Sequence, residues 1–143
     1  MTTPKRVSPA EAKALLENGY LYVDVRSEAE FEEAHPASAV NVPIMHLGAG
    51  GMTPNPDFLA VMTAAFPKDA KLVVGCKAGG RSLRAATVLL GAGFSDVVDQ
   101  RAGFDGQRDA FGAFTEKGWG PAGLPVERGA TAGATYADVK AKR

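Results

Sequence analysis

Residues 71–93, KLVVGCKAGGRSLRAATVLLGAG, decide the fold class of this chain. Residues 71–75 form an apolar run that is typical of a strand buried on both faces, as parallel strands are. A helix is predicted over about residues 81–90, and Gly93 supplies a left-handed stop to it. The spacing predicts that its core face carries Leu83, Ala86, Thr87 and Leu90. A buried strand followed directly by a helix is the repeating unit of parallel α/β folds.

The same alternation extends in both directions from this stretch. Residues 8–11 and 27–30 each match a capping box at a helix start, and Gly19 can end the first helix. The remaining pattern predicts a loop at residues 46–54, a helix from 55–56 to about 66, and short strands at 21–25, 40–42 and 96–99. We therefore predict a three-layer α/β fold in which a parallel sheet is flanked by helices.

The end of the chain shows a weaker pattern. After Gly103 we expect one more helix, a Gly/Pro-rich turn at residues 118–125 and a poorly ordered tail. The predicted organisation is one domain over residues 1–127 and a C-terminal tail over residues 128–143.

Composition excludes several functions. The chain has 143 residues, with 16 Lys+Arg against 16 Asp+Glu, so no general basic field is available for nucleic acid or a membrane. One cysteine with His35 and His46 provides too few ligands for a zinc or iron–sulfur site, and we expect no metal or other cofactor. No membrane-spanning run or secretory signal is visible, so the expected location is the cytoplasm, where a free thiol is stable.

Cys76 lies at the carboxyl end of the buried strand, where open parallel sheets bind their ligands. The glycines that follow let backbone N–H groups turn toward a common centre, and the helix adds the positive end of its dipole. No acidic residue lies between Asp69 and Asp96, whereas this window holds Lys71, Lys77, Arg81 and Arg84. The setting favours the thiolate and predicts a nucleophile for an anionic substrate.

Simpler interpretations of the same residues exist. A free cysteine is often a small buried hydrophobe, although a position between a strand and a glycine-rich helix start favours chemistry. Lys77 and Arg84 are equally well explained as solvated charges. Arg81 lies inside the loop, where its planar guanidinium can brace the backbone or meet an anion.

These residues resemble the rhodanese family, and more narrowly its single-domain thiosulfate sulfurtransferases. Residues 76–82 (CKAGGRS) are similar to the family's Cys-x-x-Gly-x-Arg-Ser loop, and residues 31–43 (FEEAHPASAVNVP) to its Phe-x-x-Gly-His…Ala-x-Asn-Ile-Pro segment. Shorter similarities occur at residues 24–26, 91–98 and 119–126. Together they run from Val7 to about Glu127 in the family's order. Ala34 and Ser38 stand where the family has glycine, and residues 105–118 look like an insertion.

The resemblance implies a rhodanese-like fold and an enzyme that transfers sulfane sulfur through a persulfide on Cys76. The thiolate would attack thiosulfate or another donor, release sulfite and pass the sulfur to cyanide or a thiol, with a protein as a further acceptor. The residues implied to bind the persulfide and substrate are Lys77, Ala78, Gly79, Gly80, Arg81 and Ser82.

The resemblance also extends to residues around the loop. We expect Asp24 and Arg26 to form a supporting carboxylate–guanidinium brace. His35 is interpreted as a turn residue satisfied by hydrogen bonds, and Trp119 and the phenylalanines as core.

Two other functions remain open. Dual-specificity phosphatases and arsenate reductases resemble this strand, cysteine loop and helix, but they have five residues between cysteine and arginine. Here four residues separate Cys76 from Arg81, and Ser82 takes the arginine position. The second alternative is a non-catalytic binding or sulfur-relay module that another protein loads.

Overall fold

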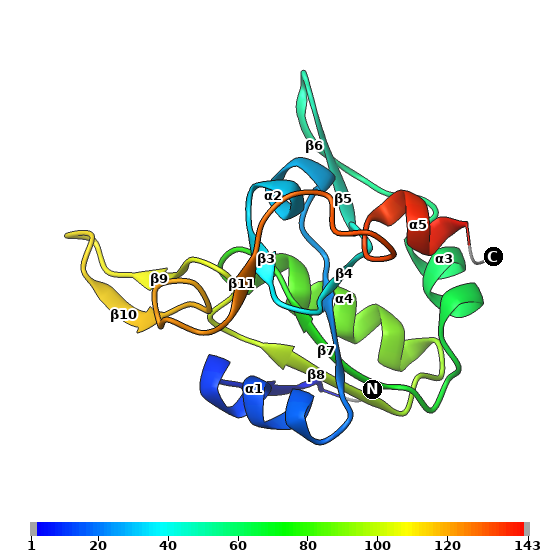
Figure 1. Cartoon of the computed structure of the whole chain (residues 1–143), viewed down its shortest axis with the longest axis horizontal. Coiled ribbons are helices and arrows are strands. Elements are labelled where there is room, and N and C mark those ends of the chain that lie inside the picture. Colours follow the sequence, from blue (N-terminus) through cyan, green and yellow to red (C-terminus); the bar gives the residue numbers. More distant parts are fainter. Residues whose placement is uncertain (1–2, 142–143) are drawn as a thin grey trace.

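The computed structural model describes residues 3–141 and is built on a five-stranded sheet whose strand pairings are all parallel (Figure 1). In spatial order the strands are β1 (Lys5–Val7), β8 (Asp96–Gln100), β7 (Lys71–Gly75), β2 (Leu21–Asp24) and β4 (Val40–Asn41). The sheet confirms the predicted fold class. Strand β1 was not predicted, because only Val7 of its three residues is buried and no apolar pattern marks it.

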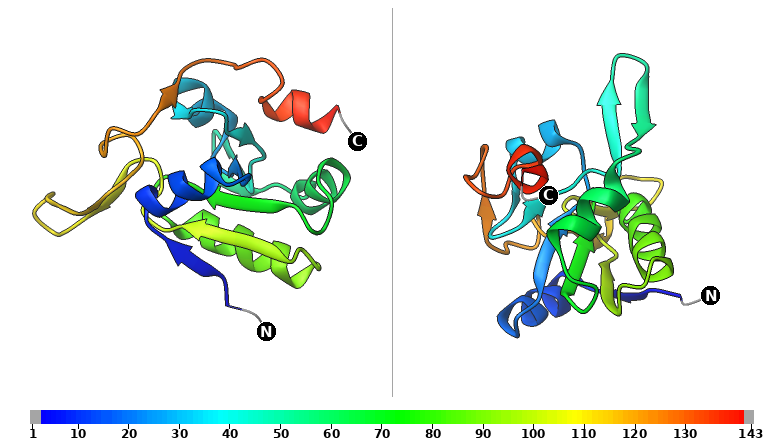
Figure 2. Two further views of the ribbon diagram at one scale, coloured as in Figure 1. Left: turned by 60° about the horizontal axis from the view of Figure 1, so that its bottom comes forward. Right: turned by 90° about the vertical axis from the view of Figure 1, so that its right-hand side faces the viewer.

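Alternate residues of the strands supply two separate cores. On one face, side chains such as Val23, Leu72 and Val74 pack under α3 (Phe58–Ala65), α4 (Gly80–Gly91) and α5 (Tyr136–Lys140). On the other, Tyr22, Val73 and Val98 pack with α1 (Pro9–Glu17), α2 (Glu28–Glu33) and Trp119. Figure 2 shows α1 and α4 on opposite sides of the sheet, which confirms the three layers.

Local signals at the helix ends are confirmed. Ser8 with Glu11 and Ser27 with Glu30 both form complete capping boxes. Gly93 has the left-handed φ of +101° expected of a helix stop. The buried face of α4 differs from the prediction, since Ser82, Ala85, Ala86 and Leu89 are buried while Leu83, Thr87 and Leu90 are half-buried. Small residues let α4 lie close to the sheet and turn Ser82 toward the cysteine loop.

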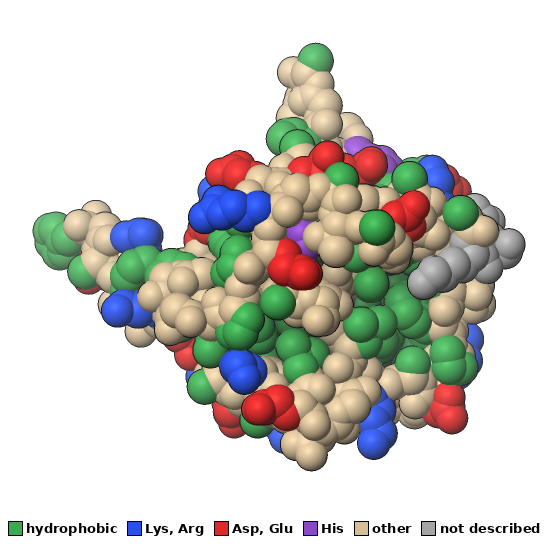
Figure 3. Space-filling view, viewed as in Figure 1, with side chains coloured by type: hydrophobic (Ala, Val, Ile, Leu, Met, Phe, Trp, Pro, Cys, Tyr) green, Lys and Arg blue, Asp and Glu red, His purple; other side chains and the backbone are tan. Residues whose placement is uncertain are grey.

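Two segments form hairpins that the sequence did not predict. Residues 46–54, expected as a loop, pair as β5 (Met45–Gly48) and β6 (Gly51–Pro54). In the insertion, where a helix was expected, β9 (Gly106–Arg108) pairs with β10 (Phe114–Lys117). Left-handed glycines at 51, 106 and 112 permit these turns. Both hairpins project from the body (Figure 3).

The beginning of α3 and the C-terminal segment also differ from expectation. Helix α3 starts at Phe58, because Asn55 Oδ1 accepts a hydrogen bond from Asp57 N at 3.0 Å in a turn before it. The described part of the tail is not poorly ordered: Tyr136 and Val139 are 4% and 1% exposed within the core. Strand β11 (Val126–Glu127) pairs with β3 (His35–Pro36). Among residues 3–141, no helix is long and apolar enough to cross a membrane.

Candidate active site

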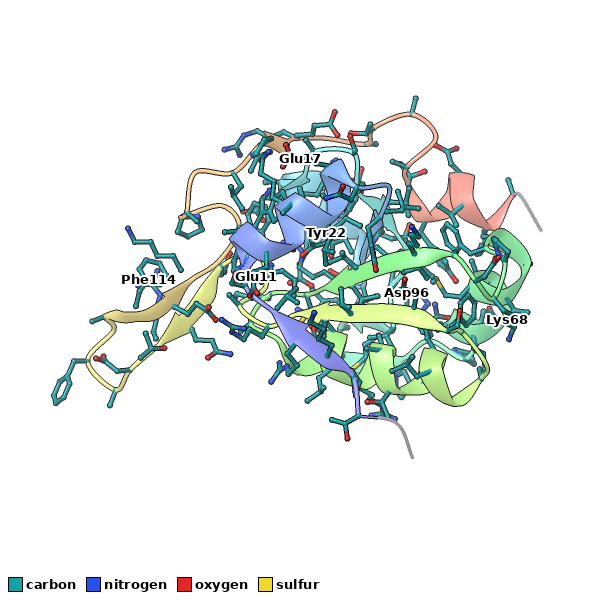
Figure 4. The ribbon with its side chains drawn as sticks, turned by 90° about the horizontal axis from the view of Figure 1, so that it is seen from below. Glu11, Glu17, Tyr22, Lys68, Asp96 and Phe114 are labelled. Carbon is teal, nitrogen blue, oxygen red and sulfur yellow. The ribbon has the colours of Figure 1, made fainter. Side chains whose placement is uncertain are left out.

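The carboxyl ends of β2, β7 and β8 converge on the cysteine loop. Figure 4 shows the direction of the strands, with Lys68 and Asp96 at their amino ends and Phe114 on the hairpin beyond their carboxyl ends. Cys76 follows β7 directly and is 2% exposed. From the other side, Phe104 N donates to Cys76 O at 2.7 Å and Asp105 N to Lys77 O at 3.0 Å, so the chain after β8 holds the start of the loop.

Among residues 3–141, Gly79 supplies the one backbone donor that contacts the sulfur. Its N–H lies 3.1 Å from Cys76 Sγ. Its φ of +102° is left-handed, and a Cβ built there would lie 2.3 Å from Arg101 O, so only glycine fits. The next N–H groups open α4, and the first amides of a helix have no intrahelical acceptor. One N–H of the predicted anion cradle, that of Gly79, therefore points at the sulfur.

Ser82 lies beneath the thiol and is 0% exposed. Cys76 Sγ donates to Ser82 Oγ at 3.5 Å, and that hydroxyl donates to Gly79 O at 3.3 Å. The sequence identified Ser82 only as a member of the loop. The structure places its hydroxyl next to the sulfur of Cys76.

Arg81 braces the loop. Its Nη1 and Nη2 donate to the two carboxylate oxygens of Glu30 at 2.7 and 3.0 Å. Burial acts to raise the pKa of Glu30, but the bonds from Arg81 and Ser27 outweigh it and hold this pKa at about 2. Of the two predicted roles of Arg81, the occupied guanidinium fork favours the brace, and attraction of a substrate anion stays a prediction.

The predicted excess of positive charge around the thiol is largely neutralised. Besides the Arg81–Glu30 pair, Lys77 Nζ lies 3.8 Å from an oxygen of Asp105, with the two side chains 60% and 50% exposed. Lys77, Ala78 and Gly80 are exposed on the rim of the loop. The acidic partners come from distant parts of the chain, so an acid-free window in sequence does not make an acid-free region in space.

Asp24 and Arg26 form the predicted brace. Arg26 Nε and Nη2 donate to the two oxygens of Asp24 at 3.0 and 2.8 Å, and Nη2 also donates to Ala34 O at 2.6 Å. Burial alone would lower the pKa of Arg26, but Asp24 raises it above its ordinary value. The guanidinium carbon also lies 4.6 Å from the centroid of the Phe104 ring.

A cavity of about 140 Å³ opens beside the loop. It is lined by Arg26, Glu30, Glu33, Ala34, Lys77, Phe104 and Asp105. A wider hollow of about 620 Å³ lies between the loop and the β9–β10 hairpin. Sequence reasoning missed Glu30, Phe104 and Asp105. Only the capping box marked Glu30, and it indicated a helix start rather than a contact with the loop.

The remaining predicted residues are structural. His35 Nδ1 donates to Phe31 O at 2.7 Å and the ring is 0% exposed, as expected of a satisfied turn residue. Trp119 is 1% exposed and donates to Pro125 O at 2.7 Å. The assignment of all phenylalanines to the core is wrong for Phe111, which is 95% exposed at the hairpin tip. Within residues 3–141, no group of three or more His, Cys, Asp or Glu side chains is arranged to hold a metal ion.

Comparisons with known proteins agree with this geometry. A family model described as Rhodanese-like domain matches residues 8–110. Thiosulfate sulfurtransferase 16, chloroplastic, of Arabidopsis thaliana is 40% identical over 87% of this chain and 93% of its own length. Protein HIGH ARSENIC CONTENT 1, mitochondrial, of the same plant is 38% identical over 76% of this chain and 68% of its own. The crystal structure of Rv0390 from M. tuberculosis aligns with a TM-score of 0.75 and 30% identity over 90% of this chain and all of that one.

Proposed function

The chain belongs to the rhodanese-like domain family, and from this premise we propose that it is a sulfurtransferase that carries sulfane sulfur as a persulfide on Cys76. A relative named thiosulfate sulfurtransferase supports sulfurtransferase activity in general. We propose further that thiosulfate is the donor and that cyanide or a thiol is the acceptor.

The proposed reaction needs no cofactor. The Cys76 thiolate attacks the outer sulfur of thiosulfate, the S–S bond of thiosulfate breaks, and sulfite leaves with the bonding electron pair. The enzyme then holds a persulfide anion. Cyanide attacks its terminal sulfur, thiocyanate leaves, and the Cys76 thiolate is restored. Each step transfers one sulfur atom without a change in total charge, so no general base is required once the thiolate exists.

The contact between Gly79 N–H and Cys76 Sγ at 3.1 Å carries this proposal. A backbone donor aimed at the sulfur stabilises negative charge on it, as an oxyanion hole does for a developing alkoxide. We propose that the adjacent amides at the start of α4 do the same for the outer sulfur of the persulfide. Lys77 on the rim is the cation left to attract the donor, because Arg81 is held by Glu30.

Formation of thiocyanate from thiosulfate and cyanide tests the proposal. We expect turnover by the wild-type chain and none above background by Cys76→Ser, which keeps a hydroxyl of similar size. Arg84→Ala, which changes an exposed charge on α4, serves as the control and is expected to retain activity. No thiocyanate from a folded wild-type chain would refute the choice of these substrates.

Two alternatives give distinct results in the same preparation. Hydrolysis of an aryl phosphate or reduction of arsenate, without thiocyanate formation, would assign the chain to the phosphatase and arsenate reductase class. Arsenate is included because one relative is named for high arsenic content. The guanidinium of Arg81 argues against this class, since its fork is paired with Glu30 and is not free to bind an oxyanion. A sulfur-relay module would instead accept sulfur from a partner protein while thiosulfate leaves Cys76 unmodified.

Cytoplasmic location also remains our proposal. The two plant relatives described above carry the words chloroplastic and mitochondrial in their names. Fractionation of cells that express the chain would decide the compartment, and recovery of the chain in a membrane or organelle fraction would contradict it.

A further inference from the structure

A buried ion pair lies directly behind the cysteine loop, on the two strands at the edge of the sheet. Arg6 on β1 donates through Nε to Asp99 Oδ2 on β8 at 2.7 Å. Asp99 is 0% exposed, while the Arg6 side chain is 37% exposed. Neither residue belongs to a motif of the family resemblance, and the sequence analysis assigned neither a role.

The pair is joined to the thiol through Gly79, and Asp99 also lies beside Ser82, whose hydroxyl accepts from Cys76 Sγ at 3.5 Å. Arg6 Nη2 donates to Gly79 O at 3.2 Å, and Gly79 N donates to Cys76 Sγ at 3.1 Å. Because both backbone dihedrals of Gly79 are set, at φ +102° and ψ −12°, the directions of its N–H and C=O are linked. A guanidinium that fixes the carbonyl therefore also aims the amide at the sulfur.

Burial of Asp99 costs free energy, so the Arg6–Asp99 ion pair is not explained by stability alone. Asp99 Oδ1 is buried and has no hydrogen-bond partner among the described residues. Burial raises the pKa of Asp99, and the neighbouring Ser82 hydroxyl and Arg6 only partly offset this. An ion pair with a buried, unsatisfied oxygen contributes little net stability, so the Arg6–Asp99 contact calls for another explanation.

We propose that Arg6 and Asp99 are positioning residues that orient Gly79 and thereby set the reactivity of Cys76. Arg6 adds a charged donor to the Gly79 carbonyl, which also accepts from Ser82 Oγ and Leu83 N. Asp99 holds the Arg6 guanidinium in place, and the Gly79 amide stabilises the thiolate. This deepens the proposed function, on which its relevance to sulfur transfer rests.

The pH dependence of Cys76 alkylation by iodoacetamide tests the proposal without any sulfur donor. Arg6→Lys keeps the positive charge but loses the fork that joins Asp99 to Gly79. We expect the midpoint of the alkylation profile to rise by about one pH unit, equivalent to about tenfold slower alkylation below both midpoints, because a bond to an ionised group is lost. Arg101→Lys is the matched control, since its side chain is 38% exposed and pairs with Glu116 through two bonds that do not involve the loop. Its midpoint should equal that of the wild type.

Asp99→Asn distinguishes positioning of Gly79 through Arg6 from a direct effect of the Asp99 charge on the thiol. If Asp99 acted only through space, removal of its negative charge would favour the thiolate and lower the midpoint. Positioning through Arg6 predicts a rise instead. A midpoint equal to that of the wild type in Arg6→Lys, or a lowered midpoint in Asp99→Asn, would refute the proposal. If one variant fails to fold, the other is sufficient for the test.

Failure of the proposed function is distinguishable from failure of this inference. If the wild-type chain takes no sulfur from thiosulfate but both variants shift the alkylation midpoint upward, the positioning role holds and the sulfur chemistry is wrong. If the wild type forms the persulfide and neither midpoint moves upward, the positioning role is wrong and the sulfur chemistry holds.

Discussion

Glu30→Gln is the change that most cleanly tests how the loop is braced. Glu30 serves α2 as the third residue of the Ser27 capping box and serves α4 as the partner of Arg81. Glutamine also completes a capping box, so the substitution preserves the helix start and removes the charge that holds Arg81. The variant therefore isolates the contact between α2 and the cysteine loop.

The magnitude follows from the pKa of Glu30, which is lowered from 4.5 to about 2. At about 1.4 kcal/mol per pH unit, the ionised carboxylate contributes up to roughly 3 kcal/mol to the free energy of unfolding near neutral pH. Because the folded-state pKa is the lower one, this contribution is fully present above pH 4.5 and is lost as the pH falls toward 2. The side chain retains 21% exposure, so we expect a measured loss of about 2 kcal/mol.

Urea unfolding of the wild type and the variant, followed by circular dichroism, measures this loss. The difference between them should be about 2 kcal/mol at pH 7 and less than half of that near pH 3, where unfolded Glu30 is protonated. Glu32→Gln, on the exposed face of the same helix, should change the free energy of unfolding by less than about 0.5 kcal/mol. A difference below about 0.5 kcal/mol at pH 7, or one that does not shrink in acid, would refute the reasoning.

Three further changes test other parts of the structure. Lys77→Ala should raise KM for thiosulfate by about twofold to fivefold in steady-state assays with little change in kcat, because an exposed lysine supplies weak ground-state attraction; a fall in kcat alone would contradict this. Ser38→Gly should raise Tm and stabilise the fold by about 0.5 kcal/mol. Ser38 has a φ of +71°, so glycine removes backbone strain, and the greater entropy of glycine in the unfolded chain offsets only part of this gain; a lower Tm would contradict it. Tyr136→Ala should cost about 3 kcal/mol in urea unfolding, since it empties a core site 4% exposed; a cost below about 1 kcal/mol would show that α5 is not part of the core.

The parts of the fold that local sequence encodes were predictable. Strand β7, the turn after Cys76 and the start of α4 follow one another within a few residues, so apolar pattern and glycine placement suffice. The Asp24–Arg26 brace was also accessible, because the two residues are close in sequence and match a family motif. For the same reason both capping boxes were found.

Contacts between distant segments were not predictable. Glu30 and Arg81 lie 51 positions apart, and Arg6 and Asp99 lie 93 apart. Spacing carries no signal at such distances, and the charge window around Cys76 therefore suggested a cationic site that Glu30 and Asp105 in fact neutralise. On the core face of α4, Ala86 was predicted correctly, whereas Ser82 and Ala85 were missed because small residues give a weak apolar signal although they allow close packing on the sheet.

Ser38 and the two hairpins show a different limit of prediction from sequence. The family pattern has glycine at position 38, and the structure keeps the left-handed conformation with serine, so the backbone shape persists although its usual residue is absent. The hairpins at residues 45–54 and 106–117 contain glycine at the turns and project into solvent (Figure 1), so their strands are short and carry few buried apolar residues. Patterns that report burial do not identify such strands.

Intact-mass spectrometry of the chain after incubation with thiosulfate tests the central claim most directly. We expect the wild type to gain one sulfur atom and to lose it when cyanide is added, and we expect Cys76→Ser to gain none. Peptide mapping should place the added sulfur on Cys76. A folded wild-type chain whose mass is unchanged by thiosulfate and by other sulfane donors would contradict the claim that Cys76 carries the transferred sulfur.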